Sequence, residues 1–203
     1  MTSNPSRPRI LLADDDQELT HLLRDFLSRE SFDVTLGQAI ELSRLETDAG
    51  ARSEPVELGA LLEDVIGNAD YEGAPRDCRV AFIERTPLTV NGSRDALGSA
   101  LENIVRNALA YTADSTAVEV RLSRDGDDAV IAVRDFGPGV SDPELHRIFE
   151  PFYRTDSARA RSSGGTGLVL TIAHRAISRD RGSLVARNAE GGGLQVEVRL
   201  PVT

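Results

Sequence analysis

Lysine is absent from this chain of 203 residues, and all 23 basic residues are arginine. The absence excludes every mechanism with an obligatory lysine, including the P-loop and the eukaryotic-type protein kinase with its strand lysine. The triplet Asp135-Phe136-Gly137 is therefore not the Asp-Phe-Gly motif of such a kinase.

Cysteine and long apolar runs are also scarce. Cys78 is the single cysteine, so no disulfide can form within the chain, and a reducing compartment is the simplest interpretation. No apolar run approaches the length of a membrane span, and residues 1–9 lack the apolar centre of a secretion signal. We therefore expect a soluble, cytoplasmic protein.

Positive charge is outweighed by negative charge. The chain has 33 acidic and 23 basic residues, a net charge of −10, which argues against a general nucleic-acid or membrane-surface binder. Aromatic residues make up only 4% of the chain, but a hydrophobic share of 40% permits a proper core. The length suits one substantial domain, or one domain with an additional fragment.

Two asparagines four residues apart are the first sign of a site. Asn103 and Asn107 lie in the apolar-periodic segment 97–111, whose leucine, isoleucine, valine and alanine positions cover the opposite side of a helix. Amide carbonyls on one helical face can hold a Mg²⁺ ion that bridges to phosphate oxygens. Alone, the pair would also fit an exposed polar face, although asparagine inside a helix has poor propensity.

Two glycine-rich blocks follow. In Asp135–Gly139 (DFGPG) the glycines let the backbone come close to a flat ligand while the carboxylate accepts a hydrogen bond, although such a block alone is more often a turn. Gly164–Leu168 (GGTGL) offers backbone amides to phosphate at the start of a helix. Together the three blocks predict a nucleotide site.

The remaining pattern predicts a two-layer α/β sandwich, in which helices cover one face of a mixed, largely antiparallel sheet. The expected helices are 55–68, 97–111, 142–149 and 168–177, and the expected strands are 79–84, 88–90, 117–123, 129–135, 183–187 and 194–200. Turns at Asp125-Gly126 and at Gly191–Gly193 join two hairpins.

The N-terminal residues 1–36 resemble the opening strand, helix and strand of a response-regulator receiver domain. Asp14 and Asp15 stand where that family has its magnesium-binding acidic pair. The strand with the phosphorylated aspartate and the lysine of the family are missing, so we interpret 1–36 as a truncated receiver fragment. Residues 37–54 resemble the end of a dimerisation helix followed by a linker.

From residue 55 to residue 203 the order of blocks resembles the ATP-binding catalytic domain of sensor histidine kinases, which are GHKL ATPases. The resemblance implies ATP or ADP and Mg²⁺ as cofactors, with Asn107 as metal ligand, Asn103 assisting the metal and catalysis, and Arg154 reaching the γ-phosphate. Segment 141–163 would be a mobile lid. The residues implied in nucleotide binding are Asn103, Asn107, Tyr111, Asp135, Gly137, Gly139, Phe149, Phe152, Gly164, Gly165, Thr166, Gly167 and Leu168.

The chain departs from that family at several points. None of its three histidines fits the phospho-acceptor motif, so phosphotransfer would require a histidine-bearing dimerisation domain or a response regulator in trans. Ala110 stands where a cation is common, which predicts ATP binding weakened by about 1.5–3 kcal/mol. Val169 replaces a glycine, and Ser178–Gly182 replaces the usual turn. Because most of the dimerisation helices are missing, a monomer is expected.

These departures keep other functions open. A non-enzymatic nucleotide-binding pseudokinase fits the missing acceptor, Ala110 and Val169. A GHKL serine kinase of the anti-sigma type needs no internal histidine. A receiver-type switch does not fit, since its aspartate strand and lysine are missing.

Overall fold

The computed structural model describes residues 53–155 and 167–203. The receiver-like segment 1–36 and residues 37–52 of the predicted dimerisation remnant and linker lie outside these ranges. So do Gly164, Gly165 and Thr166 of the predicted phosphate-binding cluster.

A five-stranded sheet forms one layer of the molecule, with the strand order β2-β4-β5-β7-β6. Strands β2 and β4 are parallel, and every other neighbouring pair is antiparallel. This arrangement confirms the predicted mixed, largely antiparallel sheet. The strand bounds are β2 Arg79–Arg85, β4 Ala117–Asp125, β5 Asp128–Arg134, β6 Ser183–Asn188 and β7 Leu194–Pro201.

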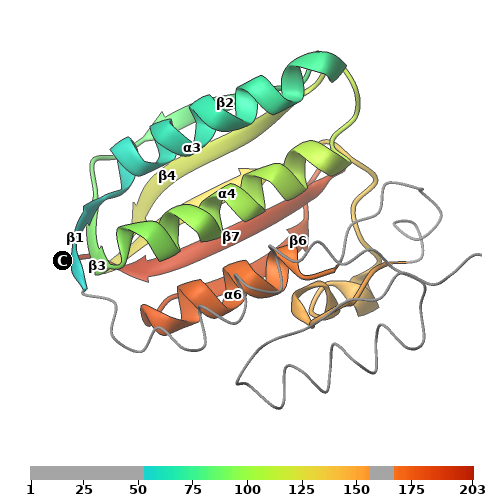
Figure 1. Cartoon of the computed structure of the whole chain (residues 1–203). Helices are drawn as coiled ribbons and strands as arrows, with labels where there is room; N and C mark the ends of the chain where they lie inside the picture. Colours follow the sequence, from blue (N-terminus) through green and yellow to red (C-terminus); the bar gives the residue numbers. More distant parts are fainter. Residues whose placement is uncertain (1–52, 156–166) are drawn as a thin grey trace, which may run out of the picture.

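Helices of the described residues form the second layer and cover one face of the sheet, as Figure 1 shows. They are α3 (Leu58–Gly73), α4 (Arg94–Tyr111) and α6 (Val169–Arg179). Helix α4 lies between the other two. Its N-cap is Ser93, whose hydroxyl accepts a hydrogen bond from the backbone N–H of Ala96. The central helix is thus the one that carries both predicted asparagines.

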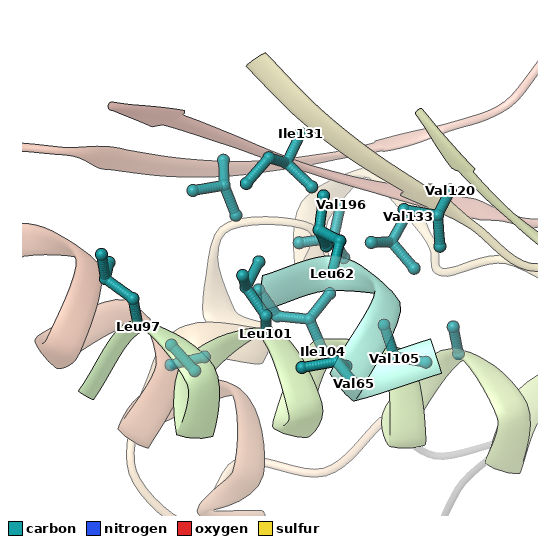
Figure 2. Packing of buried hydrophobic residues seen from close by; sticks show 14 of the residues in the cluster. Leu62, Val65, Leu97, Leu101, Ile104, Val105, Val120, Ile131, Val133 and Val196 are labelled. Atoms are coloured by element: carbon teal, nitrogen blue, oxygen red, sulfur yellow. The ribbon is translucent and has the colours of Figure 1, made fainter. Parts of the chain in front are cut away.

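The core lies between these two layers. Figure 2 shows Leu101 and Ile104 of α4 opposite Ile131, Val133 and other valines of the sheet. Burying one such side chain stabilises the fold by roughly 1.5–3 kcal/mol. Because the apolar face of α4 packs against the sheet, the opposite face, which carries the two asparagines, has a fixed position relative to the sheet.

Two predicted helices are different in the structure. Residues 54–57 form the strand β1, which pairs antiparallel with β3 (Thr89–Gly92), and α3 begins only at Leu58. Glu57 ends the strand and caps the helix, because its carboxylate accepts hydrogen bonds from the N–H groups of Gly59 and Ala60. The sequence pattern did not predict this strand, because its apolar residues directly precede the helix and continue the apolar pattern of the helix.

The second difference concerns residues 142–149, which were expected to form one short helix. They form two separate 3₁₀ turns, Asp142–Glu144 and Arg147–Phe149. No helix in residues 53–155 and 167–203 is both long enough and apolar enough to span a membrane.

Candidate functional site

A cavity of about 470 Å³ opens beside α4, at the end of β5 and the start of α6. This volume lies in the range of small-molecule sites. Of the predicted site residues, those on its wall are Asn103, Asn107, Tyr111, Asp135, Gly139, Arg154 and Gly167. Residues from widely separated parts of the sequence therefore meet at one cavity.

Helix α4 supplies one wall through Asn103, Arg106, Asn107 and Ala110. The side-chain nitrogen of Asn103 is buried, and no group in the described ranges accepts a hydrogen bond from it. A buried amide without a partner is costly, and this one stands at the edge of a cavity. An acceptor atom of a ligand in the cavity would give that N–H donor the partner it lacks.

Asp135 forms the most buried polar part of the site, with only 3% of its surface exposed. Its Oδ1 accepts hydrogen bonds from the N–H groups of Gly137 at 2.8 Å and Leu194 at 3.0 Å. Burial raises the pKa of the Asp135 carboxyl, and these two hydrogen bonds and the charge of Arg134 offset part of the rise. The hydrogen bonds fix the carboxyl group, and among the described residues none is directed to Oδ2.

The glycines after Asp135 keep the chain close to its neighbours. A Cβ atom on Gly137 would collide with the backbone carbonyl of Tyr111, so Gly137 allows the corner to pack against the end of α4. Gly139 has φ +70°, and a Cβ there would lie 2.7 Å from Oδ1 of Asn188. Gly137 thus contacts α4 without lining the cavity, whereas Gly139 is on the cavity wall.

Gly193 belongs to the same corner, although sequence reasoning assigned it only to a turn. It has φ +86°, and a Cβ there would collide with the backbone carbonyl of Asp135. The next residue, Leu194, donates its N–H to the Asp135 carboxylate and lines the cavity. The run of three glycines was the available signal, but the sequence did not say which strand end it would meet.

Another part of the cavity wall is formed by Tyr153, Arg154, Thr155, Gly167 and Val169. The chain segments that carry Tyr153 and Val169 are joined by a hydrogen bond, in which the N–H of Phe152 donates to the carbonyl of Gly167 at 3.0 Å. Phe152 and Gly167 both have positive φ, +62° and +73°, so this junction depends on unusual backbone conformations.

A group of side chains supports this part of the cavity wall. We call it the Tyr153 cluster, and its members are Ser141, Glu144, Arg147 and Tyr153. The Tyr153 hydroxyl donates to Oε1 of Glu144 at 2.7 Å, and the Ser141 hydroxyl donates to Oε2 at 2.5 Å. The Arg147 guanidinium lies 4.2 Å above the centre of the Tyr153 ring. The ring is thereby held against the cavity.

Three predicted nucleotide residues in the described ranges, besides Gly137, do not line the cavity. Phe149 stacks against His174 of α6, with ring centres 5.7 Å apart, and Leu168 is fully buried before that helix. Phe152 contributes its backbone to the Gly167 junction. In this structure the three positions pack the surroundings of the cavity.

Several wall residues were not predicted as site residues. They are Arg106, Pro138, Val140, Ile148, Tyr153, Thr155, Leu170 and Leu194. Ala110 and Val169, two departures from the family pattern, also line the cavity. Most are apolar side chains that a sequence pattern assigns equally well to a core, so only the tertiary structure could place them here.

Known proteins are similar to this chain in sequence and fold. Residues 92–203 match the family model of histidine kinase-, DNA gyrase B- and HSP90-like ATPases. The sensor histidine kinase CpxA of Escherichia coli (strain K12) is 38% identical over 212 residues, an alignment that covers 91% of this chain and 46% of the relative. The sensor-like histidine kinase SenX3 of Mycolicibacterium smegmatis is 29% identical over 198 residues, covering 95% and 51%. The chain thus spans about half the length of these curated relatives.

A solved structure agrees with the sequence relatives. The mycobacterial sensor histidine kinase MprB superposes with a TM-score of 0.68 at 28% identity, covering 73% of this chain and 98% of that one. The comparisons support an ATP-binding catalytic domain of the sensor histidine kinase type, and they do not support a receiver in residues 1–36. The family model covers more than half of the chain, from Gly92 to the last residue, so the chain belongs to the family of histidine kinase-, DNA gyrase B- and HSP90-like ATPases.

Proposed function

We propose that the cavity binds ATP with its adenine against Asp135. The carboxylate is fixed by the N–H groups of Gly137 and Leu194, which leaves Oδ2 to accept a hydrogen bond from the exocyclic amino group of adenine. Ile148, Leu170 and Tyr111 add apolar surface to the same cavity. A base with an amino group at that edge gives the buried carboxylate the donor it lacks.

The residues on α4 fit a magnesium ion. Asn103 and Asn107 are both on the cavity wall, where their amide oxygens can serve as metal ligands. The buried side-chain nitrogen of Asn103 is left as a donor for a phosphate oxygen. Amide oxygens, phosphate oxygens and water are suitable ligands for Mg²⁺, which needs no dedicated carboxylate cluster. When bound, the ion supplies neutralisation of phosphate charge. The described residues offer no group of three or more His, Cys, Asp or Glu as an alternative metal site.

The proposed reaction is transfer of the γ-phosphoryl group of ATP to a histidine of a partner domain. Arg154 also lines the cavity, and its guanidinium would neutralise charge on the transferred group. Catalysis of this kind consists mainly of positioning and charge stabilisation, so it requires an acceptor held in line. The three histidines of this sequence lack the acceptor motif, and we therefore place the acceptor on a separate dimerisation domain.

One observation carries this proposal: Asn107 of α4 and Asp135 at the end of β5 line the same cavity. Calorimetric titration of ATP with and without Mg²⁺ tests it. We expect Asn107→Ala to lose the magnesium-dependent part of the affinity, because its amide oxygen is one of the proposed ligands, while binding without the metal is unchanged. If Asn107→Ala responds to Mg²⁺ as the unaltered protein does, the metal assignment is wrong.

A second measurement separates a kinase from a binding module. The protein is incubated with γ-labelled ATP and an isolated histidine-bearing dimerisation domain. Label on the acceptor histidine supports phosphotransfer, and an unlabelled acceptor together with bound nucleotide would leave the pseudokinase as the function. Label on serine instead would support the anti-sigma type of kinase, which the similarity to CpxA, SenX3 and MprB does not favour.

A further inference from the structure

The charge on the cavity wall is unevenly distributed. Among the described residues that line it, Asp135 is the acid and Arg106 and Arg154 are the cations. The proposed function assigns the adenine base to Asp135 and the transferred phosphoryl group to Arg154. A triphosphate is strongly negative and binds where cations or backbone amides meet it. Arg106 is then the cation that α4 itself contributes beside the two asparagines.

The position of Arg106 on the helix suits this role. It lies three residues after Asn103 and directly before Asn107, and all three side chains line the cavity. Helical side chains lean towards the N-terminus, so the residue that would cover Arg106 is the one four positions later. That residue is Ala110, which is exposed and too short to cover it. The Arg106 side chain therefore has no large neighbour at position 110 to keep it from the cavity.

The present partners of Arg106 are weak enough to be exchanged. Its Nε donates to Oε2 of Glu72 on α3 at 2.9 Å, and its Nη1 lies 3.6 Å from Oε1 of Glu102. About half of each side chain is exposed, 51% for Arg106, 44% for Glu72 and 42% for Glu102. Exposed ion pairs contribute little to stability. A charge-assisted contact with phosphate inside a cavity is stronger.

We infer that Arg106 is a triphosphate-binding residue of this chain, which leaves Glu72 when ATP enters and takes up a phosphate contact beside Asn107. The inference rests on the proposed function, because it assumes that the cavity holds ATP. It also changes the prediction that Ala110 weakens ATP binding, because Arg106 supplies a cation about one helical turn before the position where Ala110 lacks one.

The test compares Arg106→Gln with Arg94→Gln. Arg94 also joins α4 to α3, through Asp64 at 2.7 Å, and does not line the cavity. ATP is titrated by calorimetry in the presence of Mg²⁺, and adenosine is titrated at millimolar concentration by NMR chemical shifts. We expect Arg106→Gln to weaken ATP binding about tenfold or more and to leave adenosine binding within twofold. Arg94→Gln should leave both affinities within twofold.

Two further variants sharpen the result. Glu72→Gln releases Arg106 from its partner and should tighten ATP binding, whereas Ala110→Arg in the Arg106→Gln background should restore most of the lost ATP affinity. The inference is overturned if Arg106→Gln binds ATP as the unaltered protein does, or if it weakens ATP and adenosine equally. Failure of the unaltered protein to bind either compound would instead overturn the proposed function.

Discussion

Two parts of the cavity wall, around Asp135 and around Tyr153, are built in different ways. At the Asp135 end, backbone groups make the contacts: the carboxylate accepts from two N–H groups, and a Cβ on Gly193 would collide with the Asp135 carbonyl. Around Tyr153, the Tyr153 cluster holds the wall through side chains that are exposed or half-buried, and Glu144 and Arg147 lie on two 3₁₀ turns. Backbone groups at the edge of the sheet fix the wall around Asp135, whereas contacts between side chains fix the wall around Tyr153.

This difference indicates where rigidity is needed. The adenine base is the same in ATP and ADP, so a preformed carboxylate costs no reorganisation on binding. In the proposed function the part of the cavity near Arg154 admits phosphate and a partner histidine, and contacts on short turns can rearrange at smaller cost. Substitutions at the Asp135 end should therefore change both stability and binding, while those in the Tyr153 cluster should change each of them less.

The largest effect is expected for Gly193→Ala. The added methyl group would meet the Asp135 carbonyl, and alanine disfavours the φ of +86°, so we expect a loss of about 3 kcal/mol in the free energy of unfolding. Gly192→Ala is the matched control, because Gly192 has φ +99° but open space around its Cβ, and it should lose about 1–2 kcal/mol. Urea denaturation measures both. Equal losses would mean that the contact with Asp135 does not matter.

Asp135→Asn should separate binding from stability. The amide keeps an oxygen for the Gly137 and Leu194 N–H groups but places a donor where adenine also donates, so nucleotide affinity should fall roughly ten- to hundredfold. Calorimetry measures this loss. Unchanged affinity would show that the carboxylate does not contact the base.

The same variant gives a pH dependence with a definite sign. Because burial raises the folded-state pKa of Asp135 above the ordinary 3.8, the folded protein binds this proton more tightly than the unfolded chain. Its contribution to stability is therefore full below pH 3.8 and is lost as the pH rises through the raised pKa. Asp135→Asn should be the more stable protein at neutral pH, and its advantage in denaturation experiments should disappear on acidification.

The smallest effect is expected for Tyr153→Phe. Removing the hydroxyl breaks the 2.7 Å hydrogen bond to Glu144 and leaves the ring under Arg147, so the free energy of unfolding should fall by about 0.5–1.5 kcal/mol. The control is Tyr71→Phe, since Tyr71 is 86% exposed on α3 and should change nothing measurable. ATP affinity should stay within twofold, and a larger loss would place the hydroxyl in direct contact with nucleotide.

Local pattern predicted much of this arrangement. The 3.6-residue period around Asn103 and Asn107 gave the central helix, and strand alternation gave β4, β5 and β7 with errors of one or two residues. It missed β1, because Val56 precedes a helix and its pairing with β3 depends on residues more than thirty positions away. Long-range pairing leaves no local signal in such a short strand.

The sequence by itself determined the chemical inventory: no lysine, two asparagines on one helical face and a carboxylate before two glycines. Only the tertiary structure decided that Gly193 and Leu194 complete the Asp135 corner, that Phe149 packs on His174, and that Arg106 stands on the cavity wall. The physical reason is that periodicity fixes which side of an element a residue occupies. The neighbour it meets there is set by how helices and strands distant in the chain pack together.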